Sequence, residues 1–409
     1  MNHLPKLSKI INDPVHGFIE INNPLVLQLI NHPIYQRLRR ISQLALSSEV
    51  YPGAVHTRFI HALGAMHLMT QALDTLRKKE VEITPEEYEA AQIAILLHDV
   101  GHGPFSHSLE KEIITNLHHE DMSAAFMHKL NQEFEGKLEL AIAIFEGKHP
   151  KKFLHQLVSS QLDMDRMDYL MRDSFFTGVV EGVIGADRLI KTLNVYENQL
   201  VVESKGIYSV ENFIVSRRLM YWQVYLHKAS ISSENMLIRI LRRARHLFEA
   251  GKEDLFLGGA LRYFFQHKVD KNSLTDTAIQ QYMLLDDHDI LYAIKQWQHD
   301  SDGILAKLSK DLLHRKLFKT QLRSEPYSKE EIKNLREQYA KANNISVEEA
   351  QYFVIAGDVS NMAYNKDNHE PIWIWYKSGE IKELAAASDM QNVTSLSKEV
   401  VKYYLCMPS

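Results

Sequence analysis

Apolar residues recur at helical spacing from residue 24 to about residue 190. One run repeats at the i, i+4, i+7, i+11 and i+15 positions, which predicts a helix with one inward stripe. The stripe consists of His61, Ala65, Leu68, Ala72 and Leu76. Because His61 lies on the stripe, its imidazole requires a polar partner inside the protein.

A second helix has a clear start and a clear end in the sequence. Thr84 is suited to the N-cap, Pro85 to the first helical position and Glu87 to closing a capping box. An apolar run follows through Leu97, and the glycines at 101 and 103 interrupt it. We therefore expect this helix to end beside the adjacent pair His98 and Asp99.

Residues 194–208 alternate in polarity around Glu197 and Asn198, which predicts a short β-hairpin. Helical patterning resumes near Val210, a charged helix begins near Ser328, and residues 351–384 are typical of strands with turns. These patterns predict a mainly α fold with a small β-hairpin and a C-terminal α+β appendage. We expect a division into a helical domain, residues 1–325, and a small subdomain, residues 326–409.

Composition excludes several classes of protein. Of 409 residues, 45% are hydrophobic and 24% are charged, which is typical of a globular chain and not of a disordered or collagen-like one. The only cysteine, Cys406, rules out an intrachain disulfide and a zinc site built from cysteines. Without a signal-peptide pattern or a membrane-length apolar run, we expect a cytoplasmic protein with no membrane partner.

Histidines gather in one segment, with six between residues 98 and 128, although the net charge of the chain is −5. The pair His98 and Asp99 could reach one metal ion. His61 lies 37 residues before His98, and Asp165 lies 66 residues after Asp99. We prefer Asp165 to Asp163 because it shares a helical face with Tyr169, whereas Asp163 points away. Such a set suits a divalent ion, Mn, Fe, Mg or Zn.

The motifs around these residues resemble a known family. The segments RFIHALG, HDVGHGPFSH, HHED and DMDRMDYLMRD resemble the HD-domain phosphohydrolases. More narrowly, NDPVHGFIEI, QRLRRISQLALSSEVYPGAVHTRFIHALG and YWQVYLHK resemble the deoxynucleoside triphosphate triphosphohydrolases of the SAMHD type and their bacterial relatives. The likeness extends over roughly residues 9–245. It implies an HD-domain helical bundle, with its core at about 45–190.

The resemblance implies roles for particular residues. The expected metal ligands are His61, His98, Asp99 and Asp165. The expected catalytic residues are His119, which protonates the leaving oxygen, together with His102 and Glu110 beside the attacked phosphate. Glu110 departs from the family pattern, in which many relatives have Asp.

The resemblance also implies a substrate site. Arg58 and Arg217 match phosphate-contacting arginines, and Arg166 stands where a relative has Lys. The residues that match the sugar-binding positions are Gln43, Leu44, Tyr169, Asp173 and Tyr225. A ribose 2′-hydroxyl would crowd Tyr225 or Leu44, so a preference for deoxynucleotides is expected.

A second, regulatory nucleotide site between subunits is implied as well, in a homo-oligomer that is a dimer or a tetramer. The positions that match it are Lys9, Ile10, Asn12, Asn31, Gln36, Arg39, His227 and Lys228. Asn31 stands where a guanine-reading relative has Asp, and an amide cannot accept two hydrogen bonds from guanine as a carboxylate can.

The expected reaction is metal-dependent hydrolysis of deoxynucleoside triphosphates, which serve as substrate and as candidate activator, to deoxynucleoside and tripolyphosphate. One alternative is an HD-superfamily nucleotidase or phosphodiesterase that acts on monophosphates, cyclic nucleotides or nucleic-acid ends. Another is a non-catalytic nucleotide-binding regulator. Nucleic acid is the less favoured partner.

Overall fold

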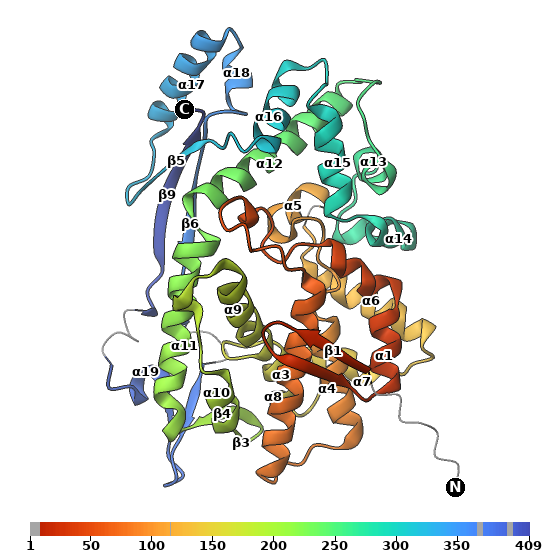
Figure 1. Cartoon of the computed structure of the whole chain (residues 1–409), viewed down its shortest axis with the longest axis vertical. Coiled ribbons are helices and arrows are strands. Elements are labelled where there is room, and N and C mark those ends of the chain that lie inside the picture. Colours follow the sequence, from red (N-terminus) through yellow and green to blue (C-terminus); the bar gives the residue numbers. More distant parts are fainter. Residues whose placement is uncertain (1–8, 115, 366–370, 391–395) are drawn as a thin grey trace.

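A computed structural model describes residues 9–114, 116–365, 371–390 and 396–409. The chain is mainly helical, with a helical bundle on one side and a long C-terminal sheet on the other (Figure 1). This architecture confirms the fold class expected from the sequence. Among the described residues, no helix combines the length and the apolar character needed to cross a bilayer.

The first half of the chain opens with a β-hairpin and continues as helices. The hairpin consists of β1 (Lys9–Asp13) and β2 (Gly17–Ile21), paired antiparallel. The helices that follow are α1 (Pro24–Asn31), α2 (Pro33–Gln36), α3 (Arg58–Lys78), α4 (Pro85–Leu97), α5 (Glu110–Ile113), α6 (His119–Glu133), α7 (Glu139–Phe145), α8 (Lys152–Val158), α9 (Met164–Thr177) and α10 (Ala186–Thr192). Short 3₁₀ turns between them are η1 (Arg37–Arg40), η2 (Ser47–Glu49), η3 (Ser106–Ser108) and η4 (Val180–Gly182).

A second hairpin separates these helices from the next group. It is formed by β3 (Leu193–Tyr196) and β4 (Gln199–Glu203), and η5 (Ser204–Gly206) follows it. The helices of the second group are α11 (Ile207–Met220), the π-helical turn η6 (Tyr221–Tyr225), α12 (Lys228–Glu249), α13 (Gly259–Gln266), α14 (Asp276–Leu284), α15 (Asp287–Trp297) and α16 (Gly303–Leu313), with η7 (Lys271–Ser273) between α13 and α14.

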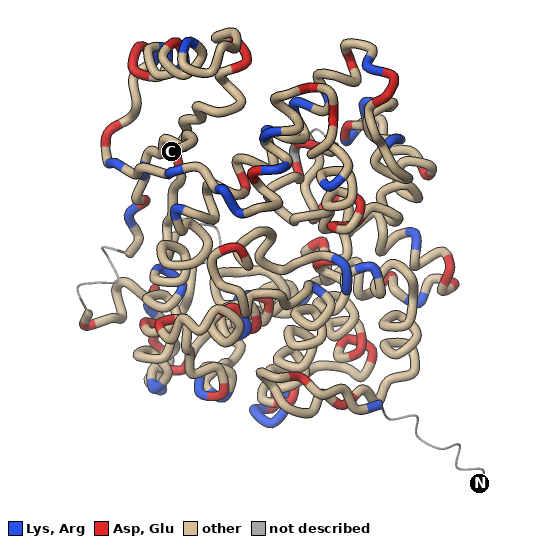
Figure 2. Tube along the Cα trace, turned by 45° about the horizontal axis from the view of Figure 1, so that its top comes forward, with Lys and Arg blue, Asp and Glu red and all other residues tan. Residues whose placement is uncertain are grey.

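Strands dominate the C-terminal part. Its elements are β5 (Lys319–Arg323), α17 (Lys329–Asn343), α18 (Val347–Ala350), β6 (Ile355–Asn361), β7 (Trp373–Trp375), β8 (Ile381–Glu383), α19 (Leu384–Ala387) and β9 (Val400–Met407). Acidic and basic residues both occur along α17, coloured red and blue on the trace (Figure 2). This helix contributes one buried residue, Ala340, which agrees with its strongly charged sequence.

The local signals in the sequence correspond to the observed elements. Thr84 and Glu87 form the expected capping box at the start of α4. Glu197 and Asn198 occupy the turn of the β3–β4 hairpin, both with positive φ, as a tight hairpin turn requires. Ser328 caps α17. These three predictions are confirmed.

Two sheets cross the expected boundary at residue 325. Strand β9 lies between β5 and β6, so the sheet order is β5-β9-β6 with antiparallel pairs. Strand β7 pairs parallel to β4 and extends the second hairpin into a sheet of order β3-β4-β7-β8. The C-terminal segment is therefore attached to the helical part by backbone hydrogen bonds in two places.

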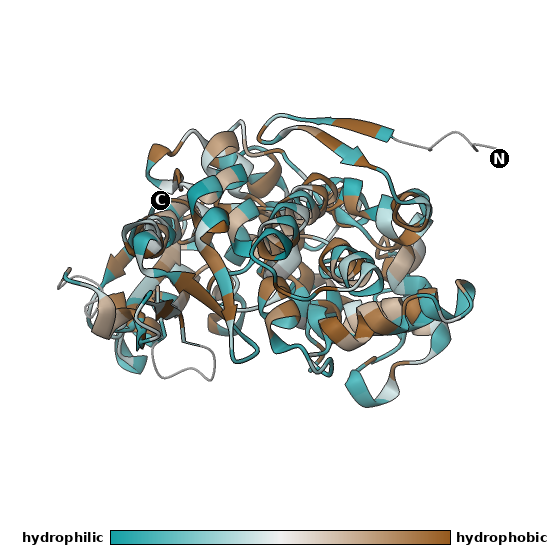
Figure 3. Cartoon of the chain, turned by 90° about the horizontal axis from the view of Figure 1, so that it is seen from below, coloured by the Kyte–Doolittle hydropathy of each residue, from teal (hydrophilic) through white to brown (hydrophobic). Residues whose placement is uncertain are grey.

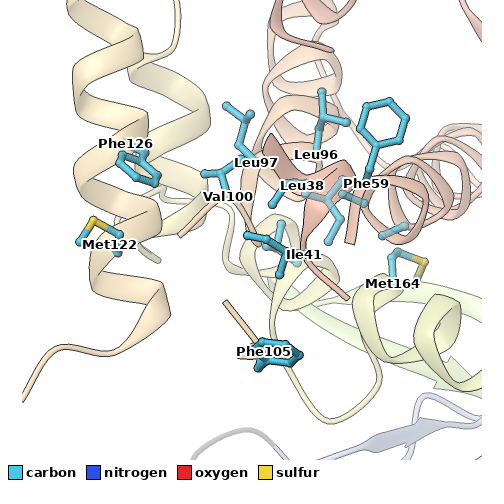
Figure 4. Close-up of a cluster of buried hydrophobic side chains, with 14 of the residues drawn as sticks. Leu38, Ile41, Phe59, Leu96, Leu97, Val100, Phe105, Met122, Phe126 and Met164 are labelled. Atoms are coloured by element: carbon cyan, nitrogen blue, oxygen red, sulfur yellow. The ribbon is translucent and has the colours of Figure 1, made fainter. Parts of the chain in front are cut away.

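The core that positions the site lies where α3, α4 and α9 pack on one another. Its apolar side chains include Leu38, Phe59, Leu97, Val100 and Met164, all at most 2% exposed (Figure 4). His61 on α3 and the pair His98 and Asp99 after α4 are buried by this packing, so their polar atoms are shielded from water. A histidine or carboxylate there must be matched by other polar groups.

Candidate active site

Four expected metal ligands meet in the core of the helical bundle. His61 comes from the first turns of α3, His98 and Asp99 follow the end of α4, and Asp165 lies in the first turn of α9. The Oδ1 atom of Asp165 lies 3.0 Å from His61 Nε2 and 3.4 Å from His98 Nε2. The carboxylate oxygens of Asp99 lie 3.6 Å and 3.3 Å from the same two nitrogens.

The geometry leaves both imidazole Nε2 atoms available. They are buried and have no hydrogen-bond partner. The opposite ring nitrogens are engaged, since His61 Nδ1 lies 2.8 Å from Asp168 Oδ2 and His98 Nδ1 lies 2.5 Å from the carbonyl oxygen of Ile95. Bonds of this kind fix the tautomer and the ring direction of metal-binding histidines. A divalent ion therefore fits this cluster: ligand atoms of His61, His98 and Asp99 all lie within 4.8 Å of one another, and Asp165 Oδ1 lies beside both histidine nitrogens.

Electrostatics favour a cation at this point. Burial alone lowers the pKa of His61, but its contacts with Asp165 and Asp168 outweigh burial and raise that pKa to about 10. Burial raises the pKa of Asp165, whereas His98 and His61 lower it well below its usual range. The carboxylates stabilise the protonated, positively charged histidines. A bound divalent ion would provide positive charge at the same place instead of those protons.

The main chain around His98 is held from three directions. Ser123 on α6 donates to the carbonyl of His98 (2.6 Å) and accepts from the amide of Gly101 (2.9 Å). Arg37, which is 1% exposed, donates to the carbonyl of His102 (2.8 Å). A Cβ at Gly101 would lie 2.2 Å from the backbone of His119. The turn that carries His98 and Asp99 is therefore rigid.

The expected catalytic residues form a stack next to the cluster. The rings of His102 and His119 lie parallel with centroids 3.8 Å apart, and His102 Nε2 lies 3.2 Å from Asp99 Oδ1. Glu110 Oε1 accepts from the backbone amide of His119 (2.6 Å) and lies 3.2 Å from its Nδ1. Glu110, whose side chain is one carbon longer than that of an aspartate, therefore contacts His119 at both its backbone amide and its ring.

A pocket of about 680 Å³ opens onto this cluster, a volume typical of small-molecule sites. The expected site residues that line it are Gln43, Leu44, Arg58, His119, Asp165, Arg166, Tyr169, Asp173 and Tyr225. The wall that completes it comes from α12, β6 and β9 and includes Glu234, Asn235, Asp358 and Tyr404. The pocket therefore combines residues from the helical bundle and from the C-terminal sheet.

Several pocket residues have defined partners. Arg58 donates to Asp99 through Nη1 (2.5 Å) and to Ser106 Oγ through Nε (2.8 Å). Asp173 accepts from the hydroxyl of Tyr225 (2.7 Å) and lies 2.7 Å from His56 Nε2. These contacts hold the arginine and the tyrosine in place at the pocket surface.

Asp163 and Asp165 occupy different environments, although they are two residues apart. Asp163 is the N-cap of α9 and accepts from the backbone amides of Ser160 (2.7 Å) and Arg166 (2.6 Å). Its carboxylate is therefore occupied by the helix start, whereas that of Asp165 faces the two histidines. The reason differs from the expected helical angle: Asp163 precedes the helix with extended backbone (φ −111°, ψ 171°), whereas Asp165 lies within its first turn.

Arg217 and the expected regulatory residues lie elsewhere. Arg217 is not among the residues that line the pocket, and its Nη1 donates to the carbonyl of Ala363 (3.2 Å). It is nevertheless close enough to act on a pocket residue: burial raises the pKa of Tyr169, and the charge of Arg217 partly opposes that rise. The expected phosphate contact of Arg217 stays a prediction: its Nε is buried without a hydrogen-bond partner, and its guanidinium lies 5.9 Å from the ring of Tyr221, which lines the pocket. The regulatory residues fall on β1, on α1 to η1 and on the start of α12: Lys9, Ile10, Asn12, Asn31, Gln36, Arg39, His227 and Lys228. A site between subunits at these positions stays a prediction.

Sequence reasoning missed residues that hold the ligands in position. Asp168 and Arg172 on α9 and Asp13 in the first hairpin form a buried ion-pair network behind His61. His56, which fixes Asp173, was also missed. For Asp168 and Arg172 a signal existed: they lie three and seven residues after Asp165 and share the helix that carries it. Asp13 and His56 gave no such signal, because the fold alone brings them to the site.

Comparisons with known proteins agree with this geometry. The family described as "HD domain" matches residues 58–173, and the one described as "HD associated region" matches residues 184–256. The crystal structure of a phosphohydrolase from Bacteroides thetaiotaomicron is 49% identical, with a TM-score of 0.94 over 98% of this chain and 100% of that one.

Two curated relatives place the chain further. The uncharacterized protein YwfO of Bacillus subtilis is 33% identical over 93% of this chain and 88% of its own length. A deoxynucleoside triphosphate triphosphohydrolase SAMHD1 homolog of Dictyostelium discoideum is 35% identical over 57% of this chain, which matches 48% of that relative. With the His61, His98, Asp99 and Asp165 cluster in its helical bundle, the chain belongs to the HD-domain phosphohydrolase family.

Proposed function

We propose that this phosphohydrolase cleaves deoxynucleoside triphosphates into deoxynucleoside and tripolyphosphate. The observation that carries the proposal is the pocket, in which Asp165 of the cluster, His119 and the two arginines Arg58 and Arg166 face one space. A polyphosphate needs this combination: cations beside the phosphates and a proton donor beside the reacting bond. The named activity of the Dictyostelium relative supports the same substrate class.

In this proposal a divalent ion would be held by His61, His98 and Asp99, which form a candidate metal group, together with Asp165, which lies beside both histidines. When bound, such an ion would polarise a phosphoryl oxygen and lower the pKa of water. Arg58 and Arg166 would offset the charge of the phosphates. Arg58 is anchored on Asp99, so its guanidinium stays next to the α-phosphate position.

His119 would protonate the departing 5′ oxygen. Its ring is fixed between Glu110, which lies 3.2 Å from Nδ1, and the parallel ring of His102. Nε2 is then the atom that delivers the proton, and the Glu110 carboxylate stabilises the charged imidazole. The same arrangement explains why a glutamate can replace the aspartate of many relatives.

The sugar would lie against Tyr225 and Leu44, both of which line the pocket. The hydroxyl of Tyr225 is tied to Asp173, which prevents the ring from moving aside for a ribose 2′-hydroxyl. Gln43 lines the same pocket with a buried Oε1 that has no hydrogen-bond partner, so it can accept a bond from a 3′-hydroxyl. The fixed Tyr225 ring favours a deoxyribose, whereas the Gln43 contact would orient the sugar through its 3′-hydroxyl.

The test is product analysis on metal-free protein given Mn, Fe, Mg or Zn separately with all four deoxynucleoside triphosphates. The expected result is deoxynucleoside and tripolyphosphate in equal amounts with at least one metal. Parallel reactions with single nucleotides show whether one nucleotide activates hydrolysis of another, as we propose for a homo-oligomer. Orthophosphate or pyrophosphate as the product, or no turnover with any metal, would contradict the proposal and direct attention to monophosphates, cyclic nucleotides or nucleic-acid ends.

A further inference from the structure

The first β-hairpin is connected to the metal cluster through buried ion pairs. Asp13, at the end of β1, accepts from Arg172 Nη1 on α9 through Oδ2 (2.8 Å). Through Oδ1 the same carboxylate accepts from the backbone amides of Val15 and His16 (both 2.9 Å) and so shapes the hairpin turn. Asp13 is 6% exposed and Arg172 is fully buried, so water does not weaken this link.

Asp168 joins the hairpin to the metal ligand. Arg172 donates to both of its oxygens, from Nε to Oδ2 (2.8 Å) and from Nη2 to Oδ1 (2.9 Å). Oδ1 also lies 2.6 Å from Nε2 of His16 in the hairpin turn, and Oδ2 lies 2.8 Å from Nδ1 of His61. One carboxylate therefore holds the hairpin with one oxygen and the ligand with the other.

The carboxylate has no room to shift. Gly64 on α3 faces it, and a Cβ at this position would lie 2.0 Å from Asp168 Oδ1 and 2.2 Å from Arg172 Nη2. The helices α3 and α9 approach this closely because residue 64 lacks a side chain. When its hydrogen-bond partners move, a carboxylate confined in this way moves with them and displaces the His61 ring.

The hairpin itself is a peripheral element. It lies along one edge of the molecule beside the helices (Figure 3). Its outer face is exposed, with Ile10 58% and Phe18 70% accessible. Its inner anchorage therefore depends on Ile19 and Ile21, which are buried, and on the contacts of Asp13 and His16.

We propose that Asp13 and His16 are positioning residues for the metal ligand His61, so that docking of the hairpin and affinity of the cluster for a divalent ion are coupled. Since coupling between two equilibria is reciprocal, metal binding tightens the hairpin and loosening of the hairpin weakens metal binding. The inference needs the metal site but not the identity of the substrate.

The first experiment measures the dissociation constant of Mn²⁺ by calorimetry on the full metal-free chain and on Asp13→Asn. Asparagine retains the oxygen that shapes the turn but removes the negative charge opposite Arg172. We expect the dissociation constant to rise by up to about 10-fold, the low end of the about 10- to 100-fold cost of removing a direct partner of a metal ligand, because Asp13 acts on His61 through Arg172 and Asp168. The matched control is Glu20→Gln, an exposed position of β2, which leaves the dissociation constant unchanged.

The reverse direction is read by hydrogen exchange. In the wild-type chain Mn²⁺ should slow exchange of the amides of residues 9–21, and in Asp13→Asn this protection should be reduced. If Asp13→Asn loses helical circular dichroism without metal, His16→Ala is measured in its place, because it removes the contact with Asp168 and a ring contact with His67 but leaves the Asp13–Arg172 ion pair intact.

An unchanged dissociation constant in a folded variant would overturn the proposal, and so would hairpin exchange that is insensitive to metal. Failure of the wild-type chain to bind Mn²⁺ would overturn the proposal together with the metal site. Neither measurement uses a nucleotide. A wrong substrate assignment would therefore leave this result intact.

Discussion

The two ends of the pocket are built in different ways. At the metal end, His61, His98 and Asp165 come from three packed helices, and each histidine is oriented by a partner behind it. At the opposite end, Asn235 on α12 accepts from the hydroxyl of Tyr404 on β9 (3.2 Å), and both side chains line the space directly. At the metal end the histidine side chains are buried and supported by further residues, whereas at the sheet end the two lining side chains contact each other directly. We propose that the metal end determines the chemistry and the sheet end the fit of the substrate.

The largest effect is expected from the metal end. Asp165→Asn removes a carboxylate that both imidazoles face, so it should weaken Mn²⁺ binding by at least about 100-fold. This is more than the cost of removing a residue that only hydrogen-bonds to a ligand, which is about 10- to 100-fold. Turnover should fall with it. Calorimetry and product release measure the two effects, and His128→Ala, which is exposed, serves as the control. Full metal affinity in the variant would exclude Asp165 as a ligand.

His119→Ala should separate chemistry from metal binding. Loss of a general acid typically costs about 100- to 10,000-fold in turnover. The affinity for Mn²⁺ should fall far less than in Asp165→Asn, because His119 is not one of the four expected ligands, although its ring lies within 4.8 Å of Asp99 and His102. Steady-state kinetics with calorimetry on the same preparation tests both statements. Retained turnover would show that another group donates the proton.

Substitutions at the sheet end should have smaller effects of another kind. Tyr404→Phe removes the hydroxyl bound to Asn235, a bond worth about 0.5–1.5 kcal/mol, so KM or the ratio among the four nucleotides should shift about 2- to 10-fold. Metal affinity should not change. The ring must be retained, because it packs on Gly357, where a Cβ would lie 2.5 Å from the hydroxyl. A loss of turnover equal to that of His119→Ala would refute the division between the two ends.

The smallest effect concerns Glu234, which lines the pocket from α12. Burial raises its pKa to about 7, partly opposed by the Ser108 hydroxyl. A carboxyl with a raised pKa makes the folded state resist ionisation, so stability falls as pH rises from the unfolded value of about 4.3 to about 7. Glu234→Gln should therefore raise Tm relative to wild type more at pH 8 than at pH 5. Thermal unfolding at both values measures this, and an equal difference at each pH would contradict it.

The sequence was sufficient for elements whose signals are local. The α4 capping box, the β3–β4 turn and the α17 N-cap each depend on residues within a few positions of one another. The choice of Asp165 over Asp163 was also local, although the reason is that Asp163 precedes the helix and not the helical angle. The helical class followed from the same kind of pattern.

Long-range pairing could not be predicted in this way. Strand β9 was not expected, because its place between β5 and β6 depends on segments about 40 to 90 residues away. Asp13 and Arg172 are 159 positions apart, and a lone aspartate before a turn gives no sign of that partner. Arg217 is similar: its Nη1 donates to the carbonyl of Ala363, 146 positions away, a partner that its motif does not indicate.

The central claim is that water attacks the α-phosphorus at the metal end of the pocket. Hydrolysis in ¹⁸O-labelled water tests this claim most directly. The account predicts that ¹⁸O enters the tripolyphosphate, with none in the 5′-hydroxyl of the deoxynucleoside, because the bond from the α-phosphorus to the 5′ oxygen breaks. Label in orthophosphate or in a nucleotide product would contradict the account, since water would then have attacked a different phosphorus.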